Sequence, residues 1–183
     1  MERTEKQYNE LVDLCREVFL RKMKDYGASW RIMRPESVTD QIFMKAQRIQ
    51  SIGVKGRQEV DDDVKSEFIG IVNYGVIGLI QMELGPGEPA ELSEKEVMEH
   101  YEAKIEEAKK LMMRKNHDYG EVWREMRISS YTDLILMKIY RTKQIEDNKG
   151  LTIASEGIDA NYLDMINYAI FGLIKIVFEK SEE

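Results

Sequence analysis

The sequence predicts an all-α protein in which two tandem three-helix repeats pack as a pseudo-twofold helical bundle. The first observation behind this prediction is an internal duplication. Residues 25–48 align with residues 118–141, and 14 of these 24 positions are identical, where chance would give about one or two. The second is that apolar residues recur at three- and four-residue spacing, as in "YNELVDLCREVFL", whereas no segment shows the alternation typical of a strand.

The periodicity indicates six helices, at about residues 4–24, 37–51 and 61–84 in the first repeat and 93–116, 130–148 and 155–180 in the second. Gly27 and Gly120 can end the first helix of each repeat in a left-handed conformation. Gly53 and Gly150 can do the same for the second helix. Each second helix is expected to begin at a serine N-cap followed three residues later by an aspartate, in the pairs Ser37 with Asp40 and Ser130 with Asp133.

The chain divides into a first repeat at residues 1–84, a linker at residues 85–92 and a second repeat at residues 93–183, which together form one compact unit. The linker follows from "ELGPGEPAELSE", which holds two of the three prolines. The third helices, "EFIGIVNYGVIGLIQM" and "NYLDMINYAIFGLIKI", are strongly apolar. Each is too apolar to face water alone, so we expect the two repeats to pack about a pseudo-twofold axis with their interface as part of the core.

Composition excludes several classes of protein. The net charge of -7 and a pI near 5.1 argue against a nucleic-acid binder, which needs a basic face. No apolar stretch approaches the roughly 20 residues of a membrane span without polar interruption, so we expect no membrane partner and a cytoplasmic protein. Cys15 is the single cysteine, which rules out a disulfide within the chain.

The repeated string "DYGxxWRxMR" places a tryptophan and two arginines in the connection after each first helix. Trp30 and Trp123 are interpreted as packing anchors. The arginines, Arg31 and Arg34 with their counterparts Arg124 and Arg127, allow two interpretations. They fix the connector through ion pairs with neighbouring aspartates, or they bind an anion together with the Lys-x-x-Arg pair of the second helix (Lys45 and Arg48, or Lys138 and Arg141).

The two copies differ in the third helix. The second repeat places Asn161, Asp164 and Asn167 at three-residue spacing, where the first has Glu67, Gly70 and Asn73. A carboxylate on such an apolar helix is expected either to ligate a hard cation or to accept structural hydrogen bonds.

The second repeat resembles the nucleotide-modification-associated domain 1 family, through "KNHDYGEVWREM", the Lys-x-x-Arg helix and "LDMINYA". The matching residues are Lys115, Asn116, Asp118, Tyr119, Gly120, Lys138, Arg141, Asp164, Asn167, Tyr168 and Ala169. The first repeat matches less well and looks like a diverged copy. The family's name implies a role around nucleotides.

A more distant similarity links the helical pattern to the MazG-like all-α nucleoside triphosphate pyrophosphatases, which bind magnesium through carboxylates. Their paired acidic signatures are absent here, although Glu156 and Asp159 have suitable spacing. Magnesium is therefore a hypothetical cofactor, with Glu156, Asp159 and Asp164 as its candidate ligands.

Two functions follow as hypotheses: a nucleotide-binding protein acting as a magnesium-dependent nucleoside triphosphate pyrophosphohydrolase, or a non-catalytic module that binds a nucleotide or other phosphorylated small molecule. No catalytic residue is assigned. The candidate nucleotide and phosphate ligands are Lys115, Asn116, Asp118, Tyr119, Arg124, Arg127, Lys138, Arg141, Asn167 and Tyr168. A homodimer is also expected, with the methionine-rich segment "LMMRK" as a contact.

Overall fold

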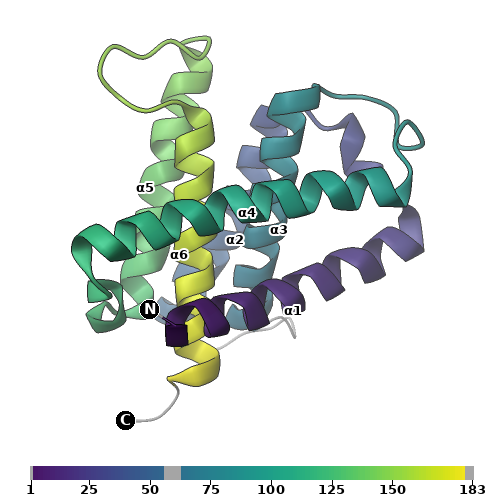
Figure 1. Cartoon of the computed structure of the whole chain (residues 1–183). Coiled ribbons are helices and arrows are strands. Elements are labelled where there is room, and N and C mark those ends of the chain that lie inside the picture. Colours follow the sequence, from purple (N-terminus) through teal and green to yellow (C-terminus); the bar gives the residue numbers. More distant parts are fainter. Residues whose placement is uncertain (1, 56–62, 180–183) are drawn as a thin grey trace.

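The computed structural model describes residues 2–55 and 63–179, and within these ranges the chain is helical without any strand (Figure 1). The first repeat contains α1 (Glu2–Tyr26), a short 3₁₀ helix η1 (Ser29–Ile32), α2 (Pro35–Lys55) and α3 (Val64–Leu84). The second contains the matching α4 (Glu94–Tyr119), η2 (Val122–Glu125), α5 (Ile128–Asp147) and α6 (Ile158–Phe178). The predicted all-α architecture of two three-helix repeats is confirmed.

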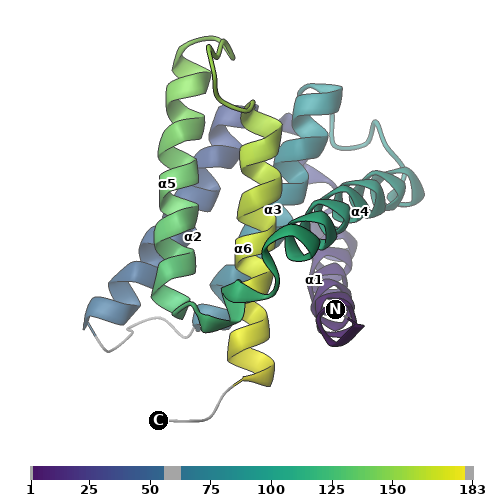
Figure 2. The same ribbon diagram turned by 60° about the vertical axis from the view of Figure 1, so that its left-hand side comes forward.

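The helices form three layers, which are visible in Figure 2. The apolar helices α3 and α6 pack side by side in the middle, α2 and α5 cover one face of this pair, and α1 and α4 cross the opposite face. By length and hydropathy alone, α3 and α6 could cross a membrane, but 72% and 67% of their most apolar windows are buried inside the bundle. Such burial is typical of the core helices of a globular protein.

Close contact between α3 and α6 depends on two glycines related by the repeat. A Cβ atom built on Gly78 would lie 2.1 Å from the ring of Tyr162, and one on Gly172 would lie 2.8 Å from the ring of Phe68. Phe68 and Tyr162 occupy equivalent positions in the two copies. The same aromatic-on-glycine contact therefore occurs twice, as a pseudo-twofold axis between α3 and α6 requires.

The asparagines at the centre of the core helices also form a matched pair of contacts. Asn167 accepts a hydrogen bond from the Tyr8 hydroxyl at 2.9 Å and donates one to the carbonyl of Ala108 at 3.0 Å. Asn73 accepts from the Tyr101 hydroxyl at 2.8 Å and donates to the carbonyl of Cys15 at 3.1 Å. Each tyrosine belongs to one repeat and its asparagine to the other. The buried amides therefore join the two halves of the bundle.

Most helix boundaries agree with the sequence, and the differences have local causes. Gly27, Gly120 and Gly150 have φ values of +65°, +68° and +80°, as predicted for helix ends. Gly53 was expected to end a helix, but it lies inside α2. Residues 155–157 precede α6 instead of starting it, because Gly157 is the N-cap. Residues 61, 62 and 180 of the predicted helices lie outside the described ranges.

The serine N-caps predicted for the second helices are wrong. Ser37 lies within α2, which starts at Pro35, and Ser130 lies within α5, which starts at Ile128. Proline has no backbone N–H and suits the first turn of a helix, which shifts the start of α2 upstream. The N-cap position of α5 is taken by Arg127, without a side-chain hydrogen bond to the helix.

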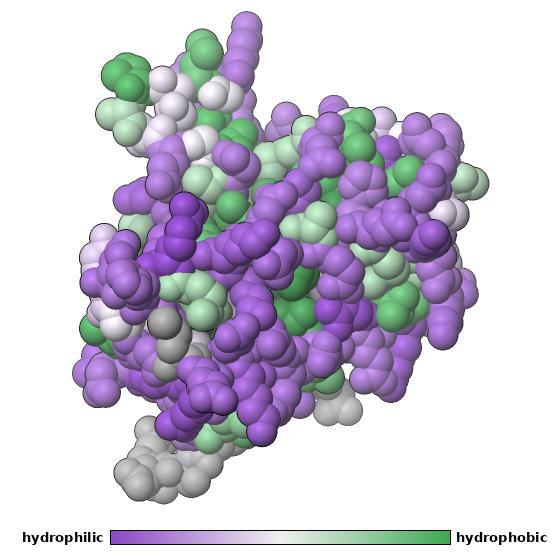
Figure 3. All heavy atoms as spheres, in the orientation of Figure 1, coloured by the Kyte–Doolittle hydropathy of each residue, from purple (hydrophilic) through white to green (hydrophobic). Residues whose placement is uncertain are grey.

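The surface over α1 and α4 is predominantly hydrophilic, whereas apolar atoms gather at the tip of the connection between α5 and α6 (Figure 3). Leu151 and Ile153 are the exposed apolar residues of that connection. In the segment "LMMRK", Met112 is buried in the core, whereas Leu111 and Met113 are partly exposed. That segment therefore offers less apolar surface for a homodimer contact than its sequence indicates.

Candidate functional site

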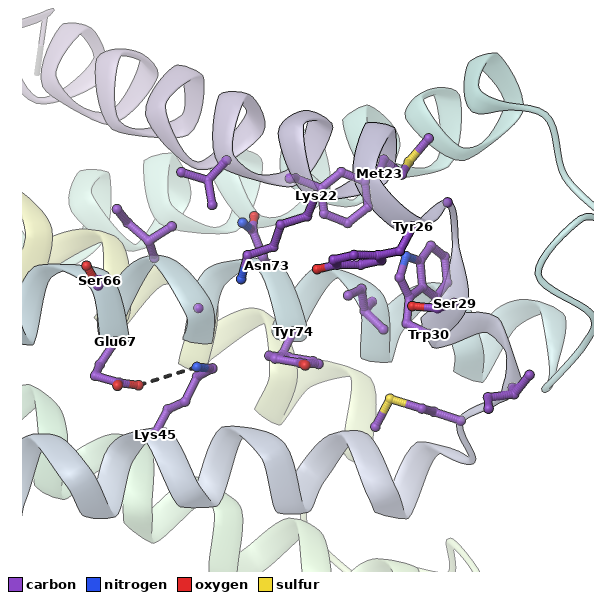
Figure 4. A pocket seen from close by; sticks show the side chains of 18 residues that line it. Lys22, Met23, Tyr26, Ser29, Trp30, Lys45, Ser66, Glu67, Asn73 and Tyr74 are labelled. Carbon is purple, nitrogen blue, oxygen red and sulfur yellow. Dashed lines mark hydrogen bonds and ion pairs between the residues drawn. The ribbon is translucent and has the colours of Figure 1, made fainter. Parts of the chain in front are cut away.

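The first repeat contains a cavity of about 740 Å³ between the end of α1, η1, α2 and α3. Figure 4 shows side chains from these four elements facing a common space. Its lining includes four aromatic residues, two lysines and several small polar groups; the residues that matter here are Phe19, Lys22, Tyr26, Trp30, Lys45, Glu67, Gly70, Asn73 and Tyr74. A space of this size is within the range of small-molecule sites, which is about 300 to 1,000 Å³.

Aromatic rings form one end of this cavity. Trp30 is only 8% exposed and lies 6.3 Å from Phe19 between ring centroids, so the predicted packing role is correct. Its indole N–H has no hydrogen-bond partner. Tyr26 is exposed at the rim, and its pKa is raised by burial of its hydroxyl and by the neighbouring Tyr74. The cavity therefore has an aromatic end against which a flat, apolar group can pack.

Cationic groups reach the cavity from two helices. Lys22 extends from the exposed side of α1 and makes no hydrogen bond or ion pair with any residue that the structure describes. Lys45 of α2 lies 3.4 Å from the buried carboxylate of Glu67, which also pairs with Arg48 at 3.1 Å. The Lys45 ammonium is 5.8 Å from the ring centroid of Tyr74. The Glu67 carboxylate thus forms ion pairs with two cations, and Lys22 adds a third positive charge.

The equivalent space in the second repeat is much smaller, about 140 Å³. Asp164 lies where the first repeat has Gly70, and its buried carboxylate bridges Lys115 at 2.5 Å and Lys138 at 2.7 Å. Burial lowers the pKa of Lys115, but the hydrogen bond and charge of Asp164 outweigh it and raise that pKa overall. Phe171 stacks on Trp123 with centroids 4.2 Å apart, in a position that Ile77 occupies in the first repeat.

Two connector arginines, the buried Arg31 and the half-buried Arg124, make hydrogen bonds that stabilise the structure. Arg31 donates to Gln81, to the carbonyl of Gly85 at 2.8 Å and to Glu91 at 3.1 Å. Arg124 donates to Glu121 at 3.0 Å, to Thr4 at 2.6 Å, to Gln7 at 2.8 Å and to Glu179. Ion pairs that fix the connector were one of the two sequence interpretations, although the partners differ from the predicted aspartates. Arg127 is exposed.

The remaining predicted ligands of the second repeat are only partly brought together. Lys115, Asn116, Tyr119, Asp164, Asn167 and Tyr168 line the small cavity, and Lys138 reaches it through Asp164. Asp118 instead pairs with His117 at the surface, and Arg141 is exposed. Asn116 donates to the sulfur of Met112 at 3.1 Å. Both ends of the Asn167 amide are used within the protein, which leaves that side chain a structural role.

The candidate magnesium ligands do not form a suitable set. Glu156 and Asp159 are exposed near the start of α6, whereas Asp164 is buried and neutralised by two lysines. No group of three or more His, Cys, Asp or Glu residues in the described part of the chain is arranged to hold a metal ion. Magnesium requires several oxygen ligands around one point. These residues therefore do not fit the ion.

Comparison of the sequence with family models identifies the family of this chain. The model described as Nucleotide modification associated domain 1 matches the chain twice, at residues 22–82 and 115–176. The chain belongs to this family. In this member of the Nucleotide modification associated domain 1 family, both matched regions start at the lysine of the first helix, Lys22 or Lys115. No curated protein and no solved structure matches the chain.

The first-repeat cavity was missed by sequence reasoning, which placed the ligand in the second repeat because that copy matches the family pattern better. The signal available in the sequence was the change from Asp164 to Gly70 between copies. Without this carboxylate, Lys22 has no ion pair with any residue that the structure describes, and Lys45 pairs with Glu67 instead. The diverged copy is therefore the one with an open site.

Proposed function

We propose that this protein binds a nucleotide in the first-repeat cavity without turning it over. The base would lie among the aromatic side chains, and a phosphate would lie near Lys22 and Lys45. The observation that carries the proposal is the presence, in one 740 Å³ cavity, of an aromatic end and two lysines that reach in from different helices.

The chemistry of the lining supports a ligand with both an aromatic and an anionic part. Stacking of a base on an aromatic side chain contributes about 1 to 3 kcal/mol. The lysine ammonium groups suit phosphate oxygens, and they supply local positive charge on a chain of net charge -7.

Hydrolysis is not part of the proposal. Phosphoanhydride cleavage by a magnesium-dependent enzyme needs carboxylates that converge on the metal. In the first repeat, Glu67 is the acidic residue in the cavity lining, and it already pairs with Lys45 and Arg48. In the second repeat Asp164 is paired with two lysines. The binding hypothesis therefore has the stronger support.

Binding can be tested by the fluorescence of Trp30. Trp123→Phe leaves Trp30 as the single tryptophan, and phenylalanine preserves an aromatic contact with Phe171. We expect nucleoside mono- and triphosphates to change this fluorescence saturably, and the matching nucleosides and inorganic pyrophosphate to bind at least tenfold more weakly. Absence of any response across bases and sugars, together with no calorimetric heat, would contradict the proposal.

Two variants of α1 separate a specific contact from general charge. Lys22→Met should weaken nucleotide binding about tenfold. This corresponds to about 1.4 kcal/mol, close to the lower end of the range of about 1.5 to 3 kcal/mol for a hydrogen bond to a charged group. Lys24→Met is the matched control, because Lys24 is exposed on the same helix and does not line the cavity. Equal losses in both variants would indicate general electrostatics. Incubation of each bound nucleotide with the protein, followed by chromatography, should recover it unchanged with or without magnesium.

A further inference from the structure

The two repeats carry the same pair of lysines but differ in what lies between them. In the second repeat, each carboxylate oxygen of Asp164 takes one ammonium group, from Lys115 at 2.5 Å and from Lys138 at 2.7 Å. The three side chains come from α4, α5 and α6. This arrangement is a complete anion site in which the anion is part of the protein.

The first repeat has the two cations without that anion. Lys22 and Lys45 are the counterparts of Lys115 and Lys138, and Gly70 is the counterpart of Asp164. A Cβ atom built on Gly70 would lie 2.6 Å from Cε and 2.9 Å from Nζ of Lys45. The flexible end of the Lys45 side chain therefore covers Gly70, in the space where an aspartate side chain would begin, and it must turn aside for an anion to bind there. Figure 4 shows Lys22 and Lys45 entering the same space.

The carboxylate present in the first repeat does not replace Asp164. Glu67 lies one helical turn earlier than Gly70, at the position of Asn161 in the other copy. It holds Lys45 at the longer distance of 3.4 Å and shares its charge with Arg48. Lys22 makes no ion pair among residues 2–55 and 63–179. A bound anion between Lys22 and Lys45 would give the first repeat the shared counter-ion that Asp164 provides in the second.

We infer that the Asp164 carboxylate marks the position at which the first repeat binds the phosphate group of its ligand, between Lys22 and Lys45 above Gly70. The identification of this group as a nucleotide phosphate rests on the proposed function. The anion site itself rests on the comparison of the two repeats, and inorganic phosphate can probe it alone. In the second repeat, the anion site is thus filled by the side chain of Asp164. In the first repeat, the equivalent site is available to a ligand.

The first test transfers the internal anion to the first repeat. Gly70→Asp should place a carboxylate between Lys22 and Lys45 and weaken the binding of inorganic phosphate, measured by calorimetry at constant ionic strength. Gly70→Ala reports the steric effect of a Cβ atom, which meets only the flexible end of Lys45. The loss in Gly70→Asp should exceed that in Gly70→Ala at least tenfold. Equal affinities of the two variants would overturn the inference.

The second test removes the internal anion from the second repeat. Asp164→Ala leaves Lys115 and Lys138 facing each other without a counter-ion, and its melting temperature should fall. Inorganic phosphate should then restore the melting temperature saturably, at an ionic strength held constant with sodium chloride, and by several degrees more than in the wild type. The double variant Lys115→Met/Asp164→Ala should lose this rescue. A rescue that is equal in the double variant, or absent from Asp164→Ala, would overturn the inference.

The two proposals fail in different ways. Phosphate effects as expected, with no nucleotide bound by the wild type, would support the anion site and contradict the proposed nucleotide function. Nucleotide binding that is equally strong in Gly70→Asp and Gly70→Ala would support the proposed function and overturn the anion position. Circular dichroism of each variant confirms that the helices are retained before binding is compared.

Discussion

The hydroxyl of Tyr8 in α1 donates a hydrogen bond of 2.9 Å to the amide oxygen of Asn167 in α6, although the two residues are 159 positions apart in the chain. Its counterpart joins Tyr101 in α4 to Asn73 in α3 at 2.8 Å. Burial raises the pKa of both tyrosines above the ordinary value of 10. Both hydroxyls therefore remain protonated donors at neutral pH.

Removing either hydroxyl should weaken the association of the two repeats. Tyr8→Phe and Tyr101→Phe each leave a buried amide oxygen without its donor, and we expect each to lower the free energy of unfolding by about 1 to 3 kcal/mol. Urea denaturation followed by circular dichroism measures the change. Tyr140→Phe is the control, because Tyr140 is exposed. A loss below about 0.5 kcal/mol in both core variants would contradict the structural role of these hydrogen bonds.

The close approach of α3 and α6 predicts opposite effects for two glycine substitutions. Gly78→Ala places a methyl group 2.1 Å from the ring of Tyr162, and overpacking of this kind should destabilise the protein by about 1 to 3 kcal/mol. Gly53→Ala adds a methyl group inside α2 with no atom within 4 Å, and it should stabilise the protein by about 0.5 to 1 kcal/mol. Differential scanning calorimetry distinguishes the two, and the same sign of change for both would contradict the packing described.

Asp164→Asn distinguishes a structural carboxylate from a metal ligand. Asparagine keeps the shape of the side chain but leaves Lys138, which is buried, without its counter-charge. We expect a loss of about 3 kcal/mol in unfolding free energy. Calorimetric titration with magnesium should give the same response in the variant and the wild type. A magnesium response that is present in the wild type and lost in Asp164→Asn would instead restore the metal hypothesis.

Glu146 gives the protein a predictable dependence on pH. Burial raises the pKa of this carboxyl above its usual 4.5, Glu36 and Asp40 add to the increase, and a hydrogen bond from Thr39 and the charge of Lys143 oppose it. The folded state therefore binds this proton more tightly than the unfolded chain, so the group's contribution to stability is present below pH 4.5 and is lost as pH rises through the folded pKa.

Glu146→Gln should consequently be more stable than the wild type at pH 7, because it avoids burying a charge and keeps an acceptor for Thr39. The difference should shrink as the pH falls and disappear below about pH 4, where the wild-type carboxyl is protonated in both states. Chemical denaturation across this range measures it. A difference that is constant with pH would indicate that the ionisation of Glu146 is not its cause.

The helical architecture was predictable because the duplication and the apolar periodicity can both be recognised directly in the sequence. The burial of α3 and α6 could be inferred from their apolar composition, and the left-handed conformation of Gly27 and Gly120 from the end of each amphipathic segment. The start of α2 could not be predicted, because Pro35 and Ser37 are both acceptable near a helix N-terminus. Choosing between them depends on how the preceding 3₁₀ turn directs the chain.

The site was harder to predict, because it depends on how side chains from different helices share space. Sequence reasoning identified the lysines of the Lys-x-x-Arg pairs, but it could not determine that Asp164 lies between Lys115 and Lys138. It also grouped Arg31 with possible anion ligands, whereas burial against Gln81 and Glu91 commits that residue to the linker. Residue types carry the chemistry, but tertiary packing decides which groups remain free to act.

The two tyrosine–asparagine contacts are isologous. The tyrosine of each repeat bonds the asparagine of the other, as the two subunits of a symmetric dimer would do. A dimer of identical single repeats would have to carry any substitution at both sites, so that both would be open or both closed. Covalent fusion removes that constraint, and one half can keep a glycine while the other acquires an aspartate. Asymmetry between the halves is therefore a freedom that the fused chain has and its symmetric equivalent would lack.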